Sequence, residues 1–262
     1  MPRRIISLTT DFGTGSPYIA EMKGVIYSIN PNATIVEISH AVAAQDIRQG
    51  ALVLQNATRR FPADTIHIAV IDPGVGTKRD IVYAQFGSQR YIAPDNGLLD
   101  RLAAEETLSR MVTLSNPQYW LPEVTSTFHG RDIMAPAAAH LSLGLDPAEL
   151  GDEKSELARL HWPEVQVVPN KVTGSVQSID SFGNLITDIT EEILAAAPRD
   201  DSVLVQCDDH QTNGIFTTYA DQPSMTLIAV IGSGGQLELA VVGDSAKMML
   251  GVAVGTPVTI SW

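Results

Sequence analysis

The order of hydrophobic and polar positions divides the chain into two blocks of different character. Over residues 1–160, apolar runs typical of strands alternate with segments of helical spacing. Strands separated by helices of this length predict an α/β fold, a doubly wound, mostly parallel sheet with helices on both faces. Over residues 170–262 only short strands follow one another, which predicts an all-β domain, a small barrel or sandwich. The boundary falls in the charged segment 150–171, and residues 161–169, which contain two prolines, are the expected linker.

The individual elements follow from the same pattern. In the first block we expect strands at 5–12, 33–39, 65–72, 81–86, 90–94 and 110–115, and helices at 18–30, 46–61, 96–106 and 134–144. In the second block we expect strands at 171–180, 184–190, 202–207, 214–220, 225–231, 236–242 and 256–262.

Composition excludes several classes of protein. With 44% hydrophobic residues the 262-residue chain can form a full core, so disorder is excluded. A net charge of -13 argues against a nucleic-acid binder that neutralises phosphates, and the acid excess is densest in the second block. No apolar run is long enough for a membrane helix, and the N-terminus turns polar too early for a signal peptide. A lone cysteine fits a reducing, cytoplasmic location.

Polar residues gather where the expected strands of the first block end, which is where open α/β sheets bind ligands. Asp72 ends a hydrophobic strand and enters a Gly-rich turn, Arg79 follows seven residues later, and His129 lies in FHGRD before a helix. For Asp72 alone, a turn-capping role is the simpler interpretation. Together, an Asp, an Arg and a His can bind and deprotonate a water molecule. Their convergence in space is a hypothesis at this level.

Other chemistries find less support. Gly13 and Gly15 follow a strand, but the dinucleotide-binding fingerprint requires a third glycine where the chain has Tyr18. The sequence holds no HExxH or other metal-ligand spacing and no GxSxG nucleophile motif, so we expect neither a metal site nor a cofactor. Cys207 lies in an apolar strand without a basic neighbour, which favours a packing role.

In the second block, SIDSFGNLITDI is the most informative segment. Asp180 and Asn184 flank an aromatic-glycine turn between two strands. A simple hairpin turn favours the same residue types. The alternative is an acid and an amide beside an aromatic wall, a combination that suits a sugar and a base.

The motifs TTDFG, DPGVGTKR, PDNGLL, STFHGRD, SFGN and GSGGQLELAV occur in the order and spacing of one family. From Ile5 to Trp262 the chain resembles the S-adenosyl-L-methionine hydroxide adenosyltransferases, which are related to fluorinase and chlorinase. The resemblance implies hydrolysis of S-adenosyl-L-methionine to adenosine and L-methionine. It also implies an N-terminal α/β domain, a C-terminal β domain and a homotrimer with the ligand between subunits.

The same resemblance implies roles for single residues. Asp72, Arg79 and His129 match the catalytic, water-activating set. The implied substrate contacts are Asp11 at the ribose hydroxyls with Phe12 beside it, Phe128, Asp180 and Asn184 at the methionine amino group and neighbouring atoms, Phe182 at adenine, Ser233 at the methionine carboxylate, and Gly243 where backbone groups contact adenine.

Halogenating relatives differ at positions that matter. In them an aromatic residue replaces Asp72, a threonine replaces Val75 and a serine that contacts halide replaces Gly130. The chain therefore has the hydrolytic set, although it carries Gly232 where its own branch usually has asparagine. Two alternatives to hydrolysis stay open: a protein that binds or senses S-adenosyl-L-methionine or adenosine with negligible turnover, and a nucleophilic halogenase.

Overall fold

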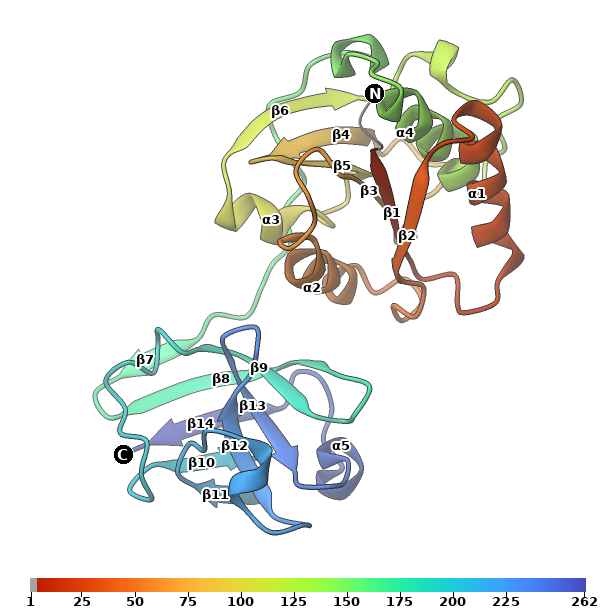
Figure 1. Cartoon of the computed structure of the whole chain (residues 1–262). Helices are drawn as coiled ribbons and strands as arrows, with labels where there is room; N and C mark the ends of the chain where they lie inside the picture. The colour runs from red at the N-terminus through yellow and green to blue at the C-terminus, as the bar shows by residue number, and fades with distance from the viewer. Residues whose placement is uncertain (1–3) are drawn as a thin grey trace. The chain divides into compact units, whose positions relative to one another are not determined.

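The computed structural model describes residues 4–262, which form two compact units (Figure 1). The first unit ends at Leu160 and the second begins at His161. Both architectures predicted from the hydrophobic pattern are confirmed. No helix within the described residues combines the length and the apolar character needed to cross a membrane.

A six-stranded sheet of order β2-β1-β3-β5-β4-β6 forms the centre of the first unit. Its first four strands are parallel, whereas β4 runs antiparallel to both β5 and β6. All five residues of β3 are buried, as expected for a strand covered on both faces. The strands are β1 Ile5–Thr10, β2 Thr34–Ser39, β3 Ile66–Val70, β4 Ile81–Phe86, β5 Gln89–Pro94 and β6 Leu108–Thr113.

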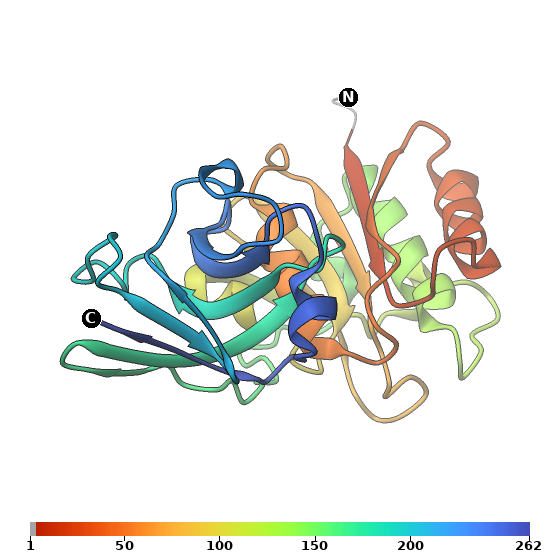
Figure 2. The same ribbon diagram turned by 90° about the horizontal axis from the view of Figure 1, so that it is seen from below.

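Helices cover both faces of this sheet, and each face has its own core. The helices α1 and α4 pack side by side on one face, and α2 and α3 lie on the other (Figures 1 and 2). Local sequence explains where two of them begin. Pro17 supplies the fixed backbone angle suited to the first turn of α1, and the Asp46 carboxylate caps α2 by accepting a hydrogen bond from the Gln49 backbone N–H. The helical bounds are α1 Pro17–Ile29, α2 Ile47–Thr58, α3 Asp100–Glu105, η1 Pro117–Tyr119, η2 Gly130–Met134, α4 Ala135–Ser142 and η3 Pro147–Leu150.

The second unit is an antiparallel, nearly closed barrel. Its strands follow the order β11-β10-β14-β8-β9-β13-β12, and β7 pairs with β8 at the side of this path. Val172, Leu185, Leu239 and Val258 are among the residues that fill its interior. The elements are β7 Gln166–Val168, β8 Lys171–Ile179, β9 Leu185–Thr190, β10 Leu204–Cys207, β11 His210–Asn213, η4 Tyr219–Asp221, β12 Leu227–Ile231, β13 Gln236–Val241, α5 Ala246–Leu250 and β14 Pro257–Ser261.

Several sequence-based expectations differ from the structure, among them the helix expected at 96–106, which spans only Asp100–Glu105. The strand expected at 214–220 is wrong: the strand β11 ends at Asn213, and the Asp221 carboxylate accepts hydrogen bonds from the backbone of 217–218 to form a helical turn instead. The helix expected at 134–144 begins earlier, with a π-helical turn from Gly130. Part of the segment expected as a linker forms β7, because its backbone pairs with β8.

Candidate functional site

The carboxyl ends of two neighbouring strands place two predicted acids at the same edge of the first unit's sheet. β1 and β3 are parallel, and their registers bring Thr10 beside Val70. Asp11 follows β1 directly, and Asp72 follows β3 after one further residue. This edge is where open α/β sheets bind ligands.

Asp72 and Arg79 form a tight ion pair at this edge. Nε of Arg79 donates to both carboxylate oxygens of Asp72, at 2.8 and 2.9 Å, and Nη2 also donates to Oδ2. The side chains are only 4% and 10% exposed, respectively. A paired, shielded carboxylate and guanidinium form a fixed dipole that can hold a water molecule and stabilise a hydroxide.

His129 joins this pair through its ring. Nη2 of Arg79 lies 3.1 Å from Nδ1 of His129. Since a guanidinium can only donate, Nδ1 is the acceptor, and the proton of the neutral ring is on Nε2. Burial and the positive charge of Arg79 lower the pKa of His129, although the charges of Asp72 and Asp132 oppose this shift. The structure thus brings together Asp72, Arg79 and His129, as the sequence analysis expects.

A buried acid not singled out in the sequence analysis fixes the loop that carries His129. Asp132 is fully buried, and its Oδ2 accepts hydrogen bonds from the backbone N–H (2.8 Å) and the hydroxyl (2.7 Å) of Thr125. Its Oδ1 accepts a hydrogen bond from Nε of Arg131 at 2.7 Å. Burial raises the pKa of Asp132, but the hydrogen bonds from Arg131 and Thr125 outweigh it and lower the pKa. Asp132 therefore stays charged and holds the segment before His129 in place.

Close packing accounts for two glycines around this set. Gly76 has a φ of 77°, and a Cβ there would collide with the backbone carbonyl of Ser126. Gly130 opens the π-helical turn, and a Cβ there would lie 3.2 Å from both γ-methyl groups of Val70. The two glycines let the turn after β3 and the His129 segment approach each other.

The other predicted residues of the first unit lie in the loop after β1 and before the π-helical turn. Asp11 accepts a hydrogen bond from the Gln45 backbone N–H at 2.7 Å, which ties two loops of the sheet edge together. Phe12 and Phe128 contact each other edge to face, with ring centroids 5.6 Å apart. Tyr18 packs edge to face against both rings. The residue that breaks the dinucleotide fingerprint thus completes an aromatic cluster.

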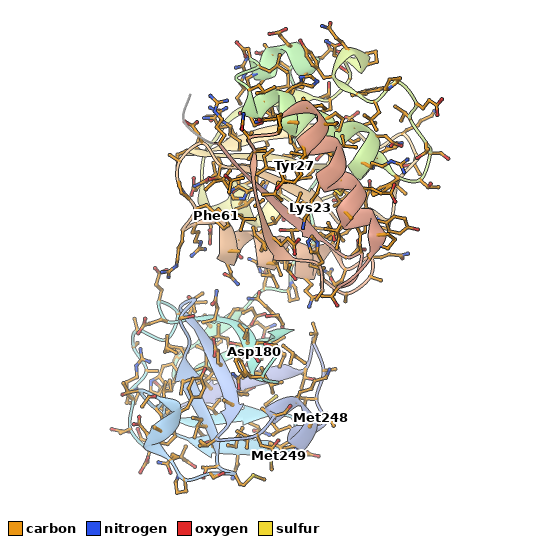
Figure 3. The ribbon with its side chains drawn as sticks, turned by 45° about the vertical axis from the view of Figure 1, so that its right-hand side comes forward. Lys23, Tyr27, Phe61, Asp180, Met248 and Met249 are labelled. Atoms are coloured by element: carbon orange, nitrogen blue, oxygen red, sulfur yellow. The ribbon has the colours of Figure 1, made fainter. Side chains whose placement is uncertain are left out.

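The five predicted residues of the second unit line one cavity of about 990 Å³, namely Asp180, Phe182, Asn184, Ser233 and Gly243. They come from the turn between β8 and β9 and from the segments after β12 and β13. Figure 3 labels Asp180 within this unit, together with Met248 and Met249 of α5. The structure therefore gathers the five predicted residues of the second unit around one cavity.

Asp180 organises the turn in which it lies. Its Oδ1 accepts backbone hydrogen bonds from Phe182 (2.9 Å) and Asn184 (2.8 Å), and its Oδ2 accepts one from the Asn184 amide at 3.0 Å. The ring of Phe182 is left 78% exposed at the tip. The hairpin and the ligand-binding interpretations of this segment are therefore compatible.

Two residues of this cavity were not singled out in the sequence analysis. Glu238 is buried on β13, and Oε2 accepts a hydrogen bond from the Tyr219 hydroxyl at 3.0 Å. Burial, reinforced by the charge of Asp180, raises the pKa of Glu238. In the sequence, Glu238 alternates with leucines in QLELAV and resembles an ordinary solvent-facing strand residue, and Tyr219 lies in the segment wrongly expected as a strand.

Within residues 4–262, no three or more His, Cys, Asp or Glu side chains are grouped so as to hold a metal ion.

Comparison with known proteins identifies the family of the chain. Residues 6–151 match the model of the SAM hydroxide adenosyltransferase N-terminal domain, and residues 174–259 match that of the C-terminal domain. The chain is 35% identical to the (R)-S-adenosyl-L-methionine hydrolase of Salinispora arenicola, covering 98% of this chain and 97% of the relative. It is 36% identical to the protein of the same name from Thermus thermophilus, covering 98% and 99%.

A fluorinase and a solved structure are also similar to the chain. The fluorinase of an Actinoplanes species is 31% identical over 71% of each chain. The crystal structure of an uncharacterized conserved protein from Thermotoga maritima is similar with a TM-score of 0.93 at 33% identity, covering 98% of this chain and 100% of that chain. Two matched domain models and full-length relatives support one conclusion. The chain belongs to the SAM hydroxide adenosyltransferase family.

Proposed function

We propose that the chain hydrolyses S-adenosyl-L-methionine to adenosine and L-methionine, with Asp72, Arg79 and His129 as the catalytic residues. The observation that carries the proposal is the hydrogen-bonded set of these three side chains at the carboxyl edge of the sheet. The names of the full-length relatives support the substrate.

The reaction is an in-line displacement. A water oxygen forms a bond to C5′ of the ribose while the bond from C5′ to the sulfonium sulfur breaks, and its electron pair stays on sulfur. Methionine leaves as a neutral thioether and water loses one proton. Because positive charge on the ligand disappears as the bond breaks, a site that positions hydroxide and excludes bulk water lowers the barrier.

The three side chains divide the work on the water molecule. Arg79 stabilises the negative charge that develops on the oxygen, and Asp72 accepts the proton. The neutral His129 keeps its Nδ1 lone pair for Arg79 and directs Nε2–H as a hydrogen-bond donor. Because Nε2 already carries the ring proton, it cannot accept a proton from the water molecule. It could do so only if the ring proton moved to Nδ1, which would break the contact with Arg79.

The remaining predicted residues hold the substrate. Asp11 accepts hydrogen bonds from the ribose hydroxyls, with the Phe12 and Phe128 rings beside it. In the second unit, Asp180 and Asn184 bind the methionine amino group and neighbouring atoms, and Phe182 flanks adenine. Ser233 binds the methionine carboxylate, and backbone groups at Gly243 contact adenine. The placement of the last five around one cavity supports these roles.

We extend the proposal to the assembly and setting of the protein. The active form is a homotrimer with each ligand between subunits, it works in the cytoplasm and it uses no cofactor. The resemblance of the chain to the SAM hydroxide adenosyltransferases, which implies a homotrimer, supports this extension. Light scattering of the purified chain tests the trimer, and dialysis against a chelator that leaves turnover unchanged tests independence from metal ions.

The direct test is release of adenosine. Purified chain is incubated with (R)-S-adenosyl-L-methionine, and adenosine and methionine are followed by chromatography in equal amounts. Calorimetric binding of the substrate without adenosine above the blank would replace hydrolysis by a binding or sensing role. Formation of 5′-chloroadenosine that depends on added chloride would instead indicate halogenation.

A further inference from the structure

The polar residues that follow β5 lie at the ligand-binding edge of the first unit, and the proposed mechanism does not use them. β5 is the parallel neighbour of β3, and their register pairs Ile68 with Ile92. Continued along both segments, this register brings Asn96 opposite Asp72. A residue at this place can act on the catalytic carboxylate without contacting the substrate.

The Asn96 side chain binds the peptide that leads into Asp72. Its Nδ2 donates a hydrogen bond to the backbone carbonyl of Ile71 at 3.0 Å. This carbonyl and the N–H of Asp72 belong to one planar peptide unit, so the bond fixes the plane from which Asp72 projects. Oδ1 of Asn96 accepts a hydrogen bond from the Leu98 backbone N–H at 3.2 Å, and the two bonds together define the orientation of the amide.

The backbone donors at the end of β5 are used elsewhere or missing. Pro94 has no N–H. The N–H of Asp95 donates to the Asp80 carbonyl at 2.9 Å, and that of Asn96 donates to the Pro94 carbonyl at 3.0 Å. The amide of Asn96 therefore supplies the Ile71 carbonyl with a donor that these backbone groups do not provide.

The turn that contains Asn96 holds the catalytic loop at both of its ends. Asp72 begins this loop, Arg79 lies near its end, and Asp80 is the next residue. The Asn96 side chain binds the peptide before Asp72, and the N–H of Asp95 binds the carbonyl of Asp80. One turn thus links the two segments that carry the Asp72–Arg79 pair.

We infer that Asn96 is a positioning residue for the reaction: by holding the Ile71 carbonyl it keeps Asp72 aligned with Arg79. The inference rests on the proposed function for the identity of the reaction. The side chain of Asn96 binds Ile71 and Leu98, neither of which is assigned to the substrate, so we expect an effect on turnover and not on substrate binding.

Asn96→Ser tests this role with a neutral change. A serine hydroxyl keeps an acceptor for the Leu98 N–H but is too short to reach the Ile71 carbonyl. We expect kcat for adenosine release to fall roughly ten- to hundredfold, the effect of a misplaced catalytic group. KM should change by less than about twofold, because the contacts that bind the substrate are retained.

Asn96→Asp removes the donor alone. It keeps the shape of the side chain and the acceptor for Leu98, but it places a carboxylate oxygen against the Ile71 carbonyl. The loss in kcat should be at least as large as for Asn96→Ser. Circular dichroism confirms that each variant is folded.

Asn116 provides a matched control. Its Nδ2 donates to the Glu149 carbonyl at 2.7 Å and its Oδ1 accepts from the Gln118 N–H at 3.1 Å, which is the same pair of bonds in a side chain that is also partly buried. It follows β6, at the far end of the sheet order, and these partners lie outside the candidate site. Asn116→Ser and Asn116→Asp should leave kcat and KM unchanged.

The titration of His129 gives a measurement that does not depend on turnover. The charges of Asp72 and Asp132 raise the pKa of this ring, whereas that of Arg79 lowers it. When Asp72 moves out of alignment, it neutralises Arg79 less, so the pKa of His129 should fall further in Asn96→Ser. An NMR titration measures the shift, and Asn116→Ser should titrate like wild type.

The outcomes separate this inference from the proposed function. Wild-type kcat in Asn96→Ser would overturn the inference, and so would a rise in KM at constant kcat, which would indicate a substrate contact. Reduced turnover with an unshifted His129 titration would indicate a purely structural role and would also overturn it. A shifted titration in a chain that never releases adenosine from S-adenosyl-L-methionine would support the positioning of the pair and contradict the proposed function alone.

Discussion

Arg79 donates a hydrogen bond to Nδ1 of His129 at 3.1 Å, and the same guanidinium binds Asp72 with two of its nitrogens. One side chain therefore sets the orientation of the carboxylate and the tautomer of the ring. A change at Arg79 therefore alters both partners at once.

Replacing Arg79 by lysine should lower kcat much more than it raises KM. An ammonium group keeps the charge but cannot bind both oxygens of Asp72 and the His129 ring together. We expect a loss in kcat of roughly a hundredfold, typical of removing a fixed donor to a developing anion. Steady-state adenosine release measures it, and Arg59→Lys, at an exposed surface pair with Glu105, is the control. Full activity of Arg79→Lys would exclude the proposed role.

The pH dependence should reflect the neutral ring of His129. Its pKa lies below the usual 6.5 because burial and the charge of Arg79 disfavour the imidazolium. Protonation would remove the Nδ1 acceptor, so kcat/KM should be constant above pH 6.5 and fall as pH decreases through the lowered pKa. The unfolded chain binds this proton near pH 6.5, so the free energy of unfolding should also decrease as the pH falls below 6.5.

Arg79→Gln should raise the pKa of His129, because it removes a positive charge and leaves Asp72 unpaired. An NMR titration of the ring measures the shift. His140, whose pKa is lowered by burial alone, should titrate as before in the same sample. An unchanged His129 titration would mean that Arg79 does not control the ring.

Asp132→Asn should reduce kcat through the position of His129. The variant removes the buried charge of Asp132, which pairs with the partly exposed Arg131, and weakens the acceptor of the Thr125 hydrogen bonds, which should cost about 2 kcal/mol of stability. Since the charge of Asp132 raises the pKa of His129, the acid limb of the kcat/KM profile should move to lower pH. Thr125→Ser keeps both donors and should resemble wild type. A stability loss without any shift of the profile would indicate a purely structural role.

Phe182→Ala should affect ligand binding without affecting the fold. The ring is 78% exposed, so the free energy of unfolding should change by less than about 0.5 kcal/mol. Loss of stacking against a base should weaken adenosine binding roughly tenfold. Calorimetry and chemical denaturation measure the two quantities, and Met248→Ala, at a side chain 77% exposed on α5, is the matched control (Figure 3). Unchanged adenosine affinity would remove Phe182 from the site.

His67→Gln should flatten the acid dependence of stability. Burial lowers the pKa of His67 to about 4, and Ser7 and Gln89 bind its ring nitrogens. The unfolded chain binds this proton near 6.5, so wild type should lose about 2 kcal/mol from this group between pH 7 and pH 5. Denaturation curves at the two pH values measure the difference between the proteins. An identical pH dependence in the variant would contradict the lowered pKa.

Much of the fold follows from patterns that the sequence carries locally. The buried run of β3 and the helical spacing of α2 predict their elements directly, and the order of strands and helices predicts the layers. The strand expected at 214–220 failed because Asp221 supplies a side-chain acceptor to the backbone there, and alternation of residue types does not register such an acceptor. The antiparallel pairing of β4 is likewise decided by contacts between distant segments.

For the candidate site, residue types at strand ends single out Asp72 and Asp180, whereas Asp11 follows from the family resemblance. Asp132 and Glu238 could not be singled out in this way, because their roles depend on burial and on hydrogen bonds that residue types do not reveal. Asp132 accepts hydrogen bonds from Thr125 across a loop, and Glu238 accepts one from Tyr219, which lies 19 residues earlier in the chain. Neither relationship leaves a periodic signal in the chain.

Gly130 has a consequence for how this chain can evolve. A side chain at this position would meet both methyl groups of Val70 at 3.2 Å, a separation that requires the valine to yield. Serine at position 130, the residue that the resemblance gives for halogenating relatives, therefore requires Val70 to shift by a few tenths of an ångström. Whether this background accepts a side chain at position 130 thus depends on how far the interior of β3 can adjust, and not only on the residues that face the ligand.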